Sequence, residues 1–381
     1  MHMHYPLLRL SAGLFALALS ISITAANKPN VVIFLTDDQG TLDVNRFGAN
    51  DLQTPHMDSL ADNGVSFTQA YAHTVCCPSR AALLTGRHPN RGGVQSWLQG
   101  DRNGSDTHSG NMDPSEITLA EVLKEAGYRT AQIGKYHVAP VSVFEFEKRL
   151  AGNARNARSM AESCRDLFQE NSDQPFFLYF CTSDPHRGGG VDKTSPLELK
   201  PDLFGNKPER KAHQGIEEVF YEPSKVKVPD FLPDTPECRA EIAQYHQSCS
   251  RIDQGLGHLV SLLKETGKWE NTVLIYTADH GMAFPGGKTT VYEAGLRVPF
   301  IVRHPKAKKT GVVNNAMISH VDITPSILDL AKAYDPERRA PLKLISVAKV
   351  PSGENGGKPP KAYHGRSWVP VLEEALSLIH I

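Results

Sequence analysis

Short apolar runs alternate with stretches of helical periodicity along most of the chain. The runs at 31–35, 176–180 and 272–276 lack polar alternation, which is typical of strands buried on both faces of a sheet. Residues 129–133 form a further short strand pattern, whereas residues 117–126 and 240–264 have the apolar spacing of amphipathic helices. This alternation predicts an α/β fold with a doubly wound, mostly parallel sheet and helices on both of its faces.

The first 26 residues have the pattern of a targeting segment rather than of a folded element. Arg9 precedes an apolar run at 10–19, and small residues follow up to Ala25 and Ala26. This is the order of regions in a secretory signal peptide, so we predict export to a periplasmic, secreted or lysosome-like compartment. A retained membrane anchor is the alternative; after position 26 no segment is apolar enough to predict a membrane span.

Composition excludes several kinds of partner, and the cysteine spacing gives no disulfide assignment. The 381 residues carry a formal net charge of −1, which gives no sign of a nucleic-acid surface or a polybasic membrane tether. A chain of this length can form one large α/β domain. The six cysteines show no paired spacing and no C-x-x-C motif, so we assign no disulfide pairing and expect no zinc site.

Acidic residues follow two of the predicted strands. Asp37 and Asp38 come directly after the run at 31–35, and Asp279 and His280 follow the run at 272–276. The carboxyl ends of parallel strands meet at one edge of a sheet, so these side chains would converge there. Such an oxygen-rich set suits calcium or magnesium. Taken alone, either pair is as typical of a turn or a helix cap.

A cysteine-containing segment, residues 76–87, reads C-x-P-S-R-x-x-x-L-T-G-R. Pro78 suits the first position of a helix and Gly86 suits its end, which places Cys76 just before the positive end of the helix dipole. Unpaired N–H groups there, with Arg80 one turn further on, would favour a bound dianion. The alternative is a small buried thiol before an ordinary helix.

This segment resembles the signature of the formylglycine-dependent sulfatases, which belong to the alkaline phosphatase superfamily. The resemblance implies that a formylglycine-generating maturation enzyme oxidises Cys76 to an aldehyde; Cys77 occupies the variable position. It also implies that one calcium ion is bound by the modified residue 76 together with Asp37, Asp38, Asp279 and His280. His280 stands where the family often has Asn.

Three further fragments resemble the family in the same order along the chain. The resemblance implies that Lys135 and His137 flank the formylglycine, that His186 contacts the transferred group, and that Lys288 reaches the sulfate. It further implies that Arg80 holds the formylglycine and the metal ligands in register. A single Lys or His after a strand is usually solvated, so only the combination carries weight. The fragments are 134–137, 184–187 and 287–299.

The resemblance covers about residues 29–370, and we place the catalytic domain at 27–370. The family's large sheet is followed by a smaller C-terminal antiparallel subdomain, which we expect to be mostly absent; residues 371–381 would be a truncated end, of which 376–381 resemble translated adapter DNA. Residues 187–236, rich in Gly, Pro and Lys, predict an irregular excursion that shapes a substrate pocket.

Within the family, several stretches look most similar to the heparan N-sulfatases, or sulfamidases. These stretches are 133–140, 174–179, 226–236 and 283–288, although Lys288 stands where those enzymes carry Arg. We therefore predict a sulfated saccharide substrate, with N-sulfoglucosamine as the favoured one. The alternatives are an O-sulfatase for another sulfated polysaccharide, a phosphate or phosphonate ester hydrolase, and a sugar-binding relative without activity.

Overall fold

The computed structural model describes residues 28–49, 51–94, 112–170, 173–333 and 363–374. The predicted signal peptide and residues 375–381 lie outside these ranges. Within them, no helix is both long and apolar enough to cross a bilayer.

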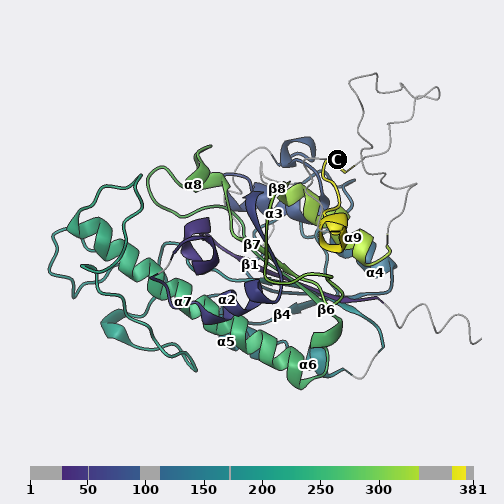
Figure 1. Ribbon diagram of the computed structural model, residues 1–381, viewed down its shortest axis with the longest axis horizontal. Coiled ribbons are helices and arrows are strands. Elements are labelled where there is room, and N and C mark those ends of the chain that lie inside the picture. The colour runs from purple at the N-terminus through teal and green to yellow at the C-terminus, as the bar shows by residue number, and fades with distance from the viewer. Residues whose placement is uncertain (1–27, 50, 95–111, 171–172, 334–362, 375–381) are drawn as a thin grey trace, which may run out of the picture.

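A single eight-stranded sheet forms the centre of the molecule, in the order β4-β3-β5-β1-β6-β7-β2-β8 (Figure 1). All strands run parallel except β7, which is antiparallel to β6 and β2. The predicted strands at 31–35, 129–133, 176–180 and 272–276 are confirmed, and four others were not predicted. The strands are β1 (Asn30–Thr36), β2 (Val65–Tyr71), β3 (Arg129–Gly134), β4 (Lys148–Leu150), β5 (Phe176–Cys181), β6 (Thr272–Ala278), β7 (Phe300–Arg303) and β8 (Val312–Ser319).

Helices cover both faces of the sheet, as the alternation predicts. Successive side chains of β1 point to opposite faces, so Ile33 packs in one apolar core and Phe34 in the other. The Ile33 core includes residues of α3 (Cys76–Thr85), α4 (Leu119–Glu125), α9 (Ile323–Leu330) and α10 (Val369–Glu374). The Phe34 core includes residues of α2 (Pro55–Asp62), α5 (Ala157–Glu162), α6 (Arg165–Gln169) and α7 (Pro236–Glu265).

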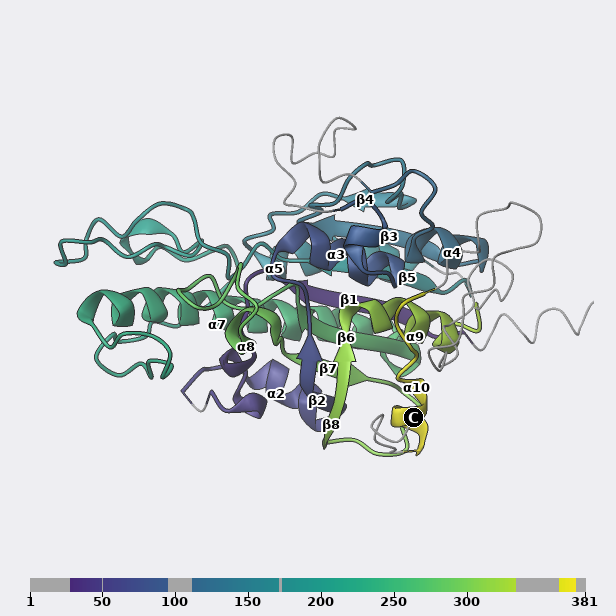
Figure 2. The same ribbon diagram turned by 90° about the horizontal axis from the view of Figure 1, so that it is seen from above.

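The excursion between β5 and α7 has little regular structure, as predicted. One 3-10 turn, Pro208–Arg210, interrupts it, and its loops lie with the first half of α7 at the left end of the molecule in both views (Figures 1 and 2). A third apolar cluster, which includes Phe204, Tyr245 and Phe284, joins these loops to α7 and to the segment after β6. The excursion is therefore packed against the segment that leaves the carboxyl end of β6. The short helix α8 (Glu293–Leu296) lies there too, since the Gly281 N–H donates to the Gly295 carbonyl oxygen.

Candidate active site

The two acidic pairs meet at the carboxyl edge of the sheet. β1 and β6 are parallel neighbours with Thr36 beside Ala278, so Asp37 and Asp279 each begin the loop after adjacent strands. The backbone N–H of Asp279 donates to the Thr36 carbonyl at 3.0 Å. Asp38 then adopts a left-handed φ of 67°, which is costly for a residue with a side chain and is typical of functional sites.

Helix α3 brings Cys76 to the same place. The helix begins at Cys76 itself rather than after it, so the predicted start at Pro78 was two residues late; Pro78 still falls in the first turn, where a missing N–H breaks no helical bond. Gly86 ends the helix with a left-handed φ of 65°, as predicted. The Cys76 sulfur lies 3.1 Å from His280 Nε2 and 3.6 Å from an Asp37 oxygen.

The carboxylates of Asp37, Asp38 and Asp279 fit a hard divalent cation, whereas the sulfur of unmodified Cys76 is a soft donor. Ligand atoms of Asp37, Cys76, Asp279 and His280 all lie within 4.8 Å of one another, and all four residues are buried. Asp38 falls in an overlapping group with Asp37 and His186, although its carboxylate is also 3.1 Å from His280 Nε2. Three buried carboxylates around one point create a strong demand for positive charge, which a calcium ion would meet.

Three cationic side chains surround these carboxylates. Lys135 pairs with Asp37 and lies 3.4 Å from the Cys76 sulfur. Lys288 pairs with Asp38 at 2.8 Å and lies 3.7 Å from the same sulfur. The two lysines therefore face the position of the expected nucleophile, where an anionic group would bind.

Arg80 is placed differently from the two lysines. Its side chain is fully buried, and its Nε and Nη2 donate to one Asp279 oxygen at 3.0 and 2.8 Å. Its Nη1 donates to the Lys135 carbonyl oxygen at 3.0 Å. This geometry suits a group that holds the ligand Asp279 and the Lys135 loop in register, the second of the two roles expected for it.

The mutual interactions shift the pKa values of the cluster. Burial alone would raise the pKa of Asp37, but Lys135, His186, Arg80 and Lys288 together bring it well below its usual range. Burial and the Asp37 charge raise the pKa of Asp38. Burial opposes protonation of His280, yet Asp279 and Asp38 raise its pKa to about 10. A proton on His280 thus supplies part of the positive charge that a bound divalent metal ion would supply to the same carboxylates.

The two predicted catalytic histidines lie at the margin of this cluster. His186 Nε2 is 3.8 Å from an Asp38 oxygen, and the ring is one-third exposed. His137 follows β3 with a left-handed φ of 49°, and its buried Nδ1 has no hydrogen-bond partner among the described residues. Burial, Lys135 and Arg80 lower the pKa of His137 to about 3, so its ring is neutral at pH 7.

Several supporting residues were not predicted from the sequence. Asp184 accepts from Arg251 at 2.8 Å and from Arg155 at 3.1 Å, and Arg155 also donates to the His186 carbonyl oxygen. The Tyr245 hydroxyl, on α7, donates to the buried Asp43 carboxylate at 2.6 Å. It also lies 3.1 Å from the backbone carbonyl oxygen of Asp38. Arg155, Arg251 and Tyr245 stand in no motif, so the sequence held no local signal for them.

The large, mostly parallel sheet with this cluster at its carboxyl edge defines an alkaline-phosphatase-like α/β fold. Residues 29–333 match the Sulfatase family, and the chain belongs to that family. The residues that carried the resemblance, among them Cys76, Asp37 and Asp279, lie within this match.

Individual relatives agree with the family assignment. Human N-sulphoglucosamine sulphohydrolase is 33% identical over 82% of this chain and 63% of its own length. An ulvan-active sulfatase of Formosa agariphila is 27% identical over 92% of this chain and 59% of its length. The chain thus spans about three fifths of the length of these relatives.

A solved structure shows the same fold at lower identity. The phosphonate monoester hydrolase of Agrobacterium radiobacter superposes with a TM-score of 0.64 at 18% identity, covering 91% of this chain and 77% of that one. This similarity supports the architecture of the sheet and its helices, and it carries no argument about the substrate.

Proposed function

We propose that this protein is a sulfatase that removes sulfate from a sulfated saccharide, with N-sulfoglucosamine as the preferred unit. The observation that carries the proposal is the position of Cys76. Its sulfur lies at the start of α3, within hydrogen-bonding reach of Lys135 and His280 and beside Asp37. In a member of the Sulfatase family, this is where an oxidised cysteine would meet both a metal and the anionic substrate.

The proposed chemistry needs residue 76 in its oxidised form. As a hydrate, the formylglycine supplies two hydroxyls, of which one attacks sulfur and the other, once deprotonated, expels sulfate and restores the aldehyde. Asp37 or Asp38 would accept the proton of the attacking hydroxyl. An Asp37 oxygen lies 3.6 Å from the Cys76 sulfur, and Asp38 is linked to that sulfur through the Lys288 ammonium. Unmodified Cys76 has one thiol and no second hydroxyl, so turnover would depend on the maturation enzyme.

The surrounding cations would stabilise charge on the sulfuryl group. The Nζ atoms of Lys135 and Lys288 lie 3.4 and 3.7 Å from the Cys76 sulfur, so both can reach oxygens of a group bound there. Asp37, Asp38, Asp279 and His280, with the modified residue 76, would hold one calcium ion, which would supply further positive charge to the sulfuryl oxygens.

The two histidines would move protons at either end of the reaction. His186, partly exposed and next to Asp38, would donate a proton to the departing oxygen or nitrogen of the sugar. His137, neutral at pH 7 and with an unpartnered Nδ1 among the described residues, would accept the proton of the second hydroxyl.

The choice of N-sulfate rests on similarity and on the excursion. The human relative named for N-sulphoglucosamine hydrolysis is 33% identical, whereas the relative named as ulvan-active is 27% identical. The stretches that resemble sulfamidases include 226–236, which lies in the excursion beside the site. An O-sulfatase for another glycan is the second candidate, because Lys288 replaces the Arg of the sulfamidase pattern and offers a single point charge.

The test is sulfate release by protein co-expressed with a formylglycine-generating enzyme, with mass spectrometry of the peptide that contains residue 76. Glucosamine N-sulfate, 6-O-sulfated glucosamine, a sulfated uronate and a phosphonate monoester would be compared at equal concentration. We expect the largest kcat/KM with the N-sulfated sugar. A larger kcat/KM for an O-sulfated sugar would contradict the proposed substrate but not the proposed mechanism. Faster phosphonate hydrolysis would overturn the sulfatase proposal.

The same proposal includes an exported protein, since the segment at 1–26 has the pattern of a signal peptide. Export would place the enzyme where extracellular or compartmental glycans are degraded. Comparison of the N-terminal sequence of the mature protein with position 27 tests this part independently.

A further inference from the structure

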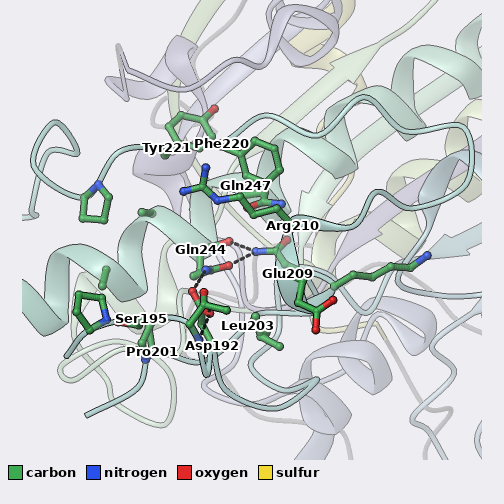
Figure 3. Close-up of a pocket in the computed structure, with 17 residues that line it drawn as sticks. Asp192, Ser195, Pro201, Leu203, Glu209, Arg210, Phe220, Tyr221, Gln244 and Gln247 are labelled. Atoms are coloured by element: carbon green, nitrogen blue, oxygen red, sulfur yellow. Dashed lines mark hydrogen bonds between the residues drawn. The ribbon is translucent and has the colours of Figure 1, made fainter. Parts of the chain in front are cut away.

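A second pocket lies in the excursion, away from the catalytic cluster. It has a volume of about 230 Å³ and is open to solvent on one side. Figure 3 shows it between α7, which carries Gln244 and Gln247, and the loops that carry Asp192, Arg210 and Phe220. None of these five residues has a part in the proposed sulfatase chemistry.

The polar groups of this pocket are held in defined orientations. Gln244 Nε2 donates to Asp192 at 3.3 Å, while Gln244 Oε1 accepts from Asn206 at 2.7 Å. Gln247 is buried and donates through Nε2 to Glu218 at 2.8 Å. Its Oε1 has no hydrogen-bond partner in the part of the chain that the structure describes, which leaves an acceptor for a hydroxyl group.

Arg210 and Lys207 are the cations that line the pocket, and Asp192 and Glu209 are its carboxylates. Its guanidinium lies 5.0 Å from the centre of the Phe220 ring, and Figure 3 shows the side chain running alongside that ring. The neighbouring Glu209 pairs with Lys211 instead, and among the described residues no carboxylate pairs with Arg210. Arg210 is exposed, and a guanidinium over an aromatic face keeps its N–H edge available for an anion.

The backbone around Arg210 is unusual in a way that suggests function. Glu209 and Arg210 both have left-handed φ values, 58° and 55°, although neither is a glycine. Two consecutive residues in this region are unfavourable, and such conformations cluster at ligand-binding positions. The turn therefore accepts strain while it presents Arg210 to the pocket.

We propose that this pocket binds an anionic saccharide unit, with its carboxylate or sulfate on Arg210 and hydroxyl groups on Gln247 and Asp192. The proposal rests on the proposed sulfatase function, because it assigns the pocket to a neighbouring unit of the same glycan. The location is consistent with this assignment. Gln244 lines the pocket, whereas the hydroxyl of the next residue, Tyr245, donates to the carbonyl oxygen of Asp38, so α7 contributes to both sites.

Binding of an unsulfated glucuronate–N-acetylglucosamine tetrasaccharide tests the inference without any catalytic step. Titration calorimetry would compare the full chain with Arg210→Gln and with Lys225→Gln. Lys225 is an exposed cation of the same excursion that does not line the pocket, so it is the matched control. We expect about tenfold weaker binding for Arg210→Gln and unchanged binding for Lys225→Gln. Comparison with the affinity for a sulfated tetrasaccharide shows whether Arg210 binds a carboxylate or a sulfate.

Three results would overturn the inference: no binding of either acidic tetrasaccharide, equal loss in both variants, or equally tight binding of a neutral N-acetylglucosamine tetrasaccharide. Kinetics distinguish its failure from that of the sulfatase proposal. Arg210→Gln should raise KM for a sulfated tetrasaccharide and leave kcat unchanged, with no effect on a sulfated monosaccharide. If the enzyme proves inactive on all sulfated sugars, binding of the unsulfated probe still decides the role of the pocket.

Discussion

The catalytic cluster and the Arg210 pocket use charged groups in opposite ways. In the cluster, the cations of Lys135, Lys288 and Arg80 each meet a buried carboxylate at the rigid ends of parallel strands. In the pocket, Arg210 rests on an exposed ring in an irregular loop and keeps its charge for a ligand. From this comparison we propose that the sheet edge determines the chemistry and that the excursion determines which saccharide is held there.

If this division is correct, substitutions in the cluster lower kcat, and the largest loss follows replacement of Cys76. Cys76→Ser cannot be oxidised by the same route to the aldehyde and lacks the second hydroxyl that expels sulfate. We expect steady-state sulfate release to fall by at least roughly 10³-fold, with at most one turnover per enzyme. The measurement is a burst assay, with mass spectrometry of residue 76. Sustained turnover by this variant would disprove the proposed nucleophile.

The next largest effect is expected at Lys288, where the side chain joins Asp38 to the nucleophile. Lys288→Met should reduce kcat by roughly 10²- to 10³-fold, because a charge that faces the sulfuryl oxygens is lost and Asp38 is left unpaired. Lys288→Arg keeps the charge and restores the residue of the sulfamidase pattern. Steady-state kinetics of both variants on N- and O-sulfated sugars would show whether charge or shape matters.

A rise in KM with an unchanged kcat in Lys288→Met would break the comparison, since the cluster would then contribute to binding rather than to chemistry. A shift of Lys288→Arg toward the N-sulfated sugar would sharpen it. In that case position 288 selects among sulfate esters and sulfamates from within the cluster, and the excursion selects only the neighbouring saccharide unit.

His186 provides a smaller effect that depends on the leaving group. If it protonates the departing atom, His186→Ala should lose roughly 10²-fold in kcat on a sugar sulfate and much less on 4-nitrophenyl sulfate, whose phenolate leaves without a proton. Arg187→Gln is a neighbouring control, because Arg187 stacks on Phe204 and Phe284 and pairs with Glu241 at the excursion. Equal losses of kcat on both substrates would exclude His186 as the proton donor to the leaving group.

Much of the cluster could be predicted from the sequence, because its residues follow buried strands. The runs before Asp37 and Asp279 are apolar throughout, and parallel neighbours place their carboxyl ends together, so convergence follows from periodicity. β2, β4, β7 and β8 were not predicted. β4 and β7 are only three and four residues long, and the β8 sequence VVNNAMIS has neither a continuous apolar run nor a strict alternation of apolar and polar residues.

The supporting contacts and the second pocket could not be predicted for a different reason. Asp184 meets Arg251 across 67 residues, and Tyr245 meets Asp43 across 202, so neither pair leaves a local pattern. Arg210 and Gln247 come from a strained turn and a helix face that pack together only in the folded chain. Resemblance to a family pointed to Cys76 as the candidate nucleophile, whereas these contacts depend on the packing of this particular excursion.

The smallest expected effect concerns pH and the excursion side of α7. His246 is buried beside Tyr221 and Tyr245, and burial lowers its pKa to about 4. In the unfolded chain, His246 takes up a proton as the pH falls below its ordinary pKa of about 6.5. In the native state its ring stays neutral down to about pH 4. Stability is therefore present above pH 6.5 and is lost as the pH falls toward 4, by about 2 kcal/mol between pH 7 and pH 5 for this residue.

His246→Phe keeps a ring against Tyr221 and removes the titrating group. Denaturant unfolding at pH 7 and pH 5 should show that the loss of stability on acidification is smaller by this amount in the variant. Hydrogen exchange would show where the acid-induced opening begins, and we expect it in the first half of α7 and the loops packed on it. Opening that starts instead at β1 and β6 would reverse the comparison, because the charged sheet edge would then be the less stable of the two regions.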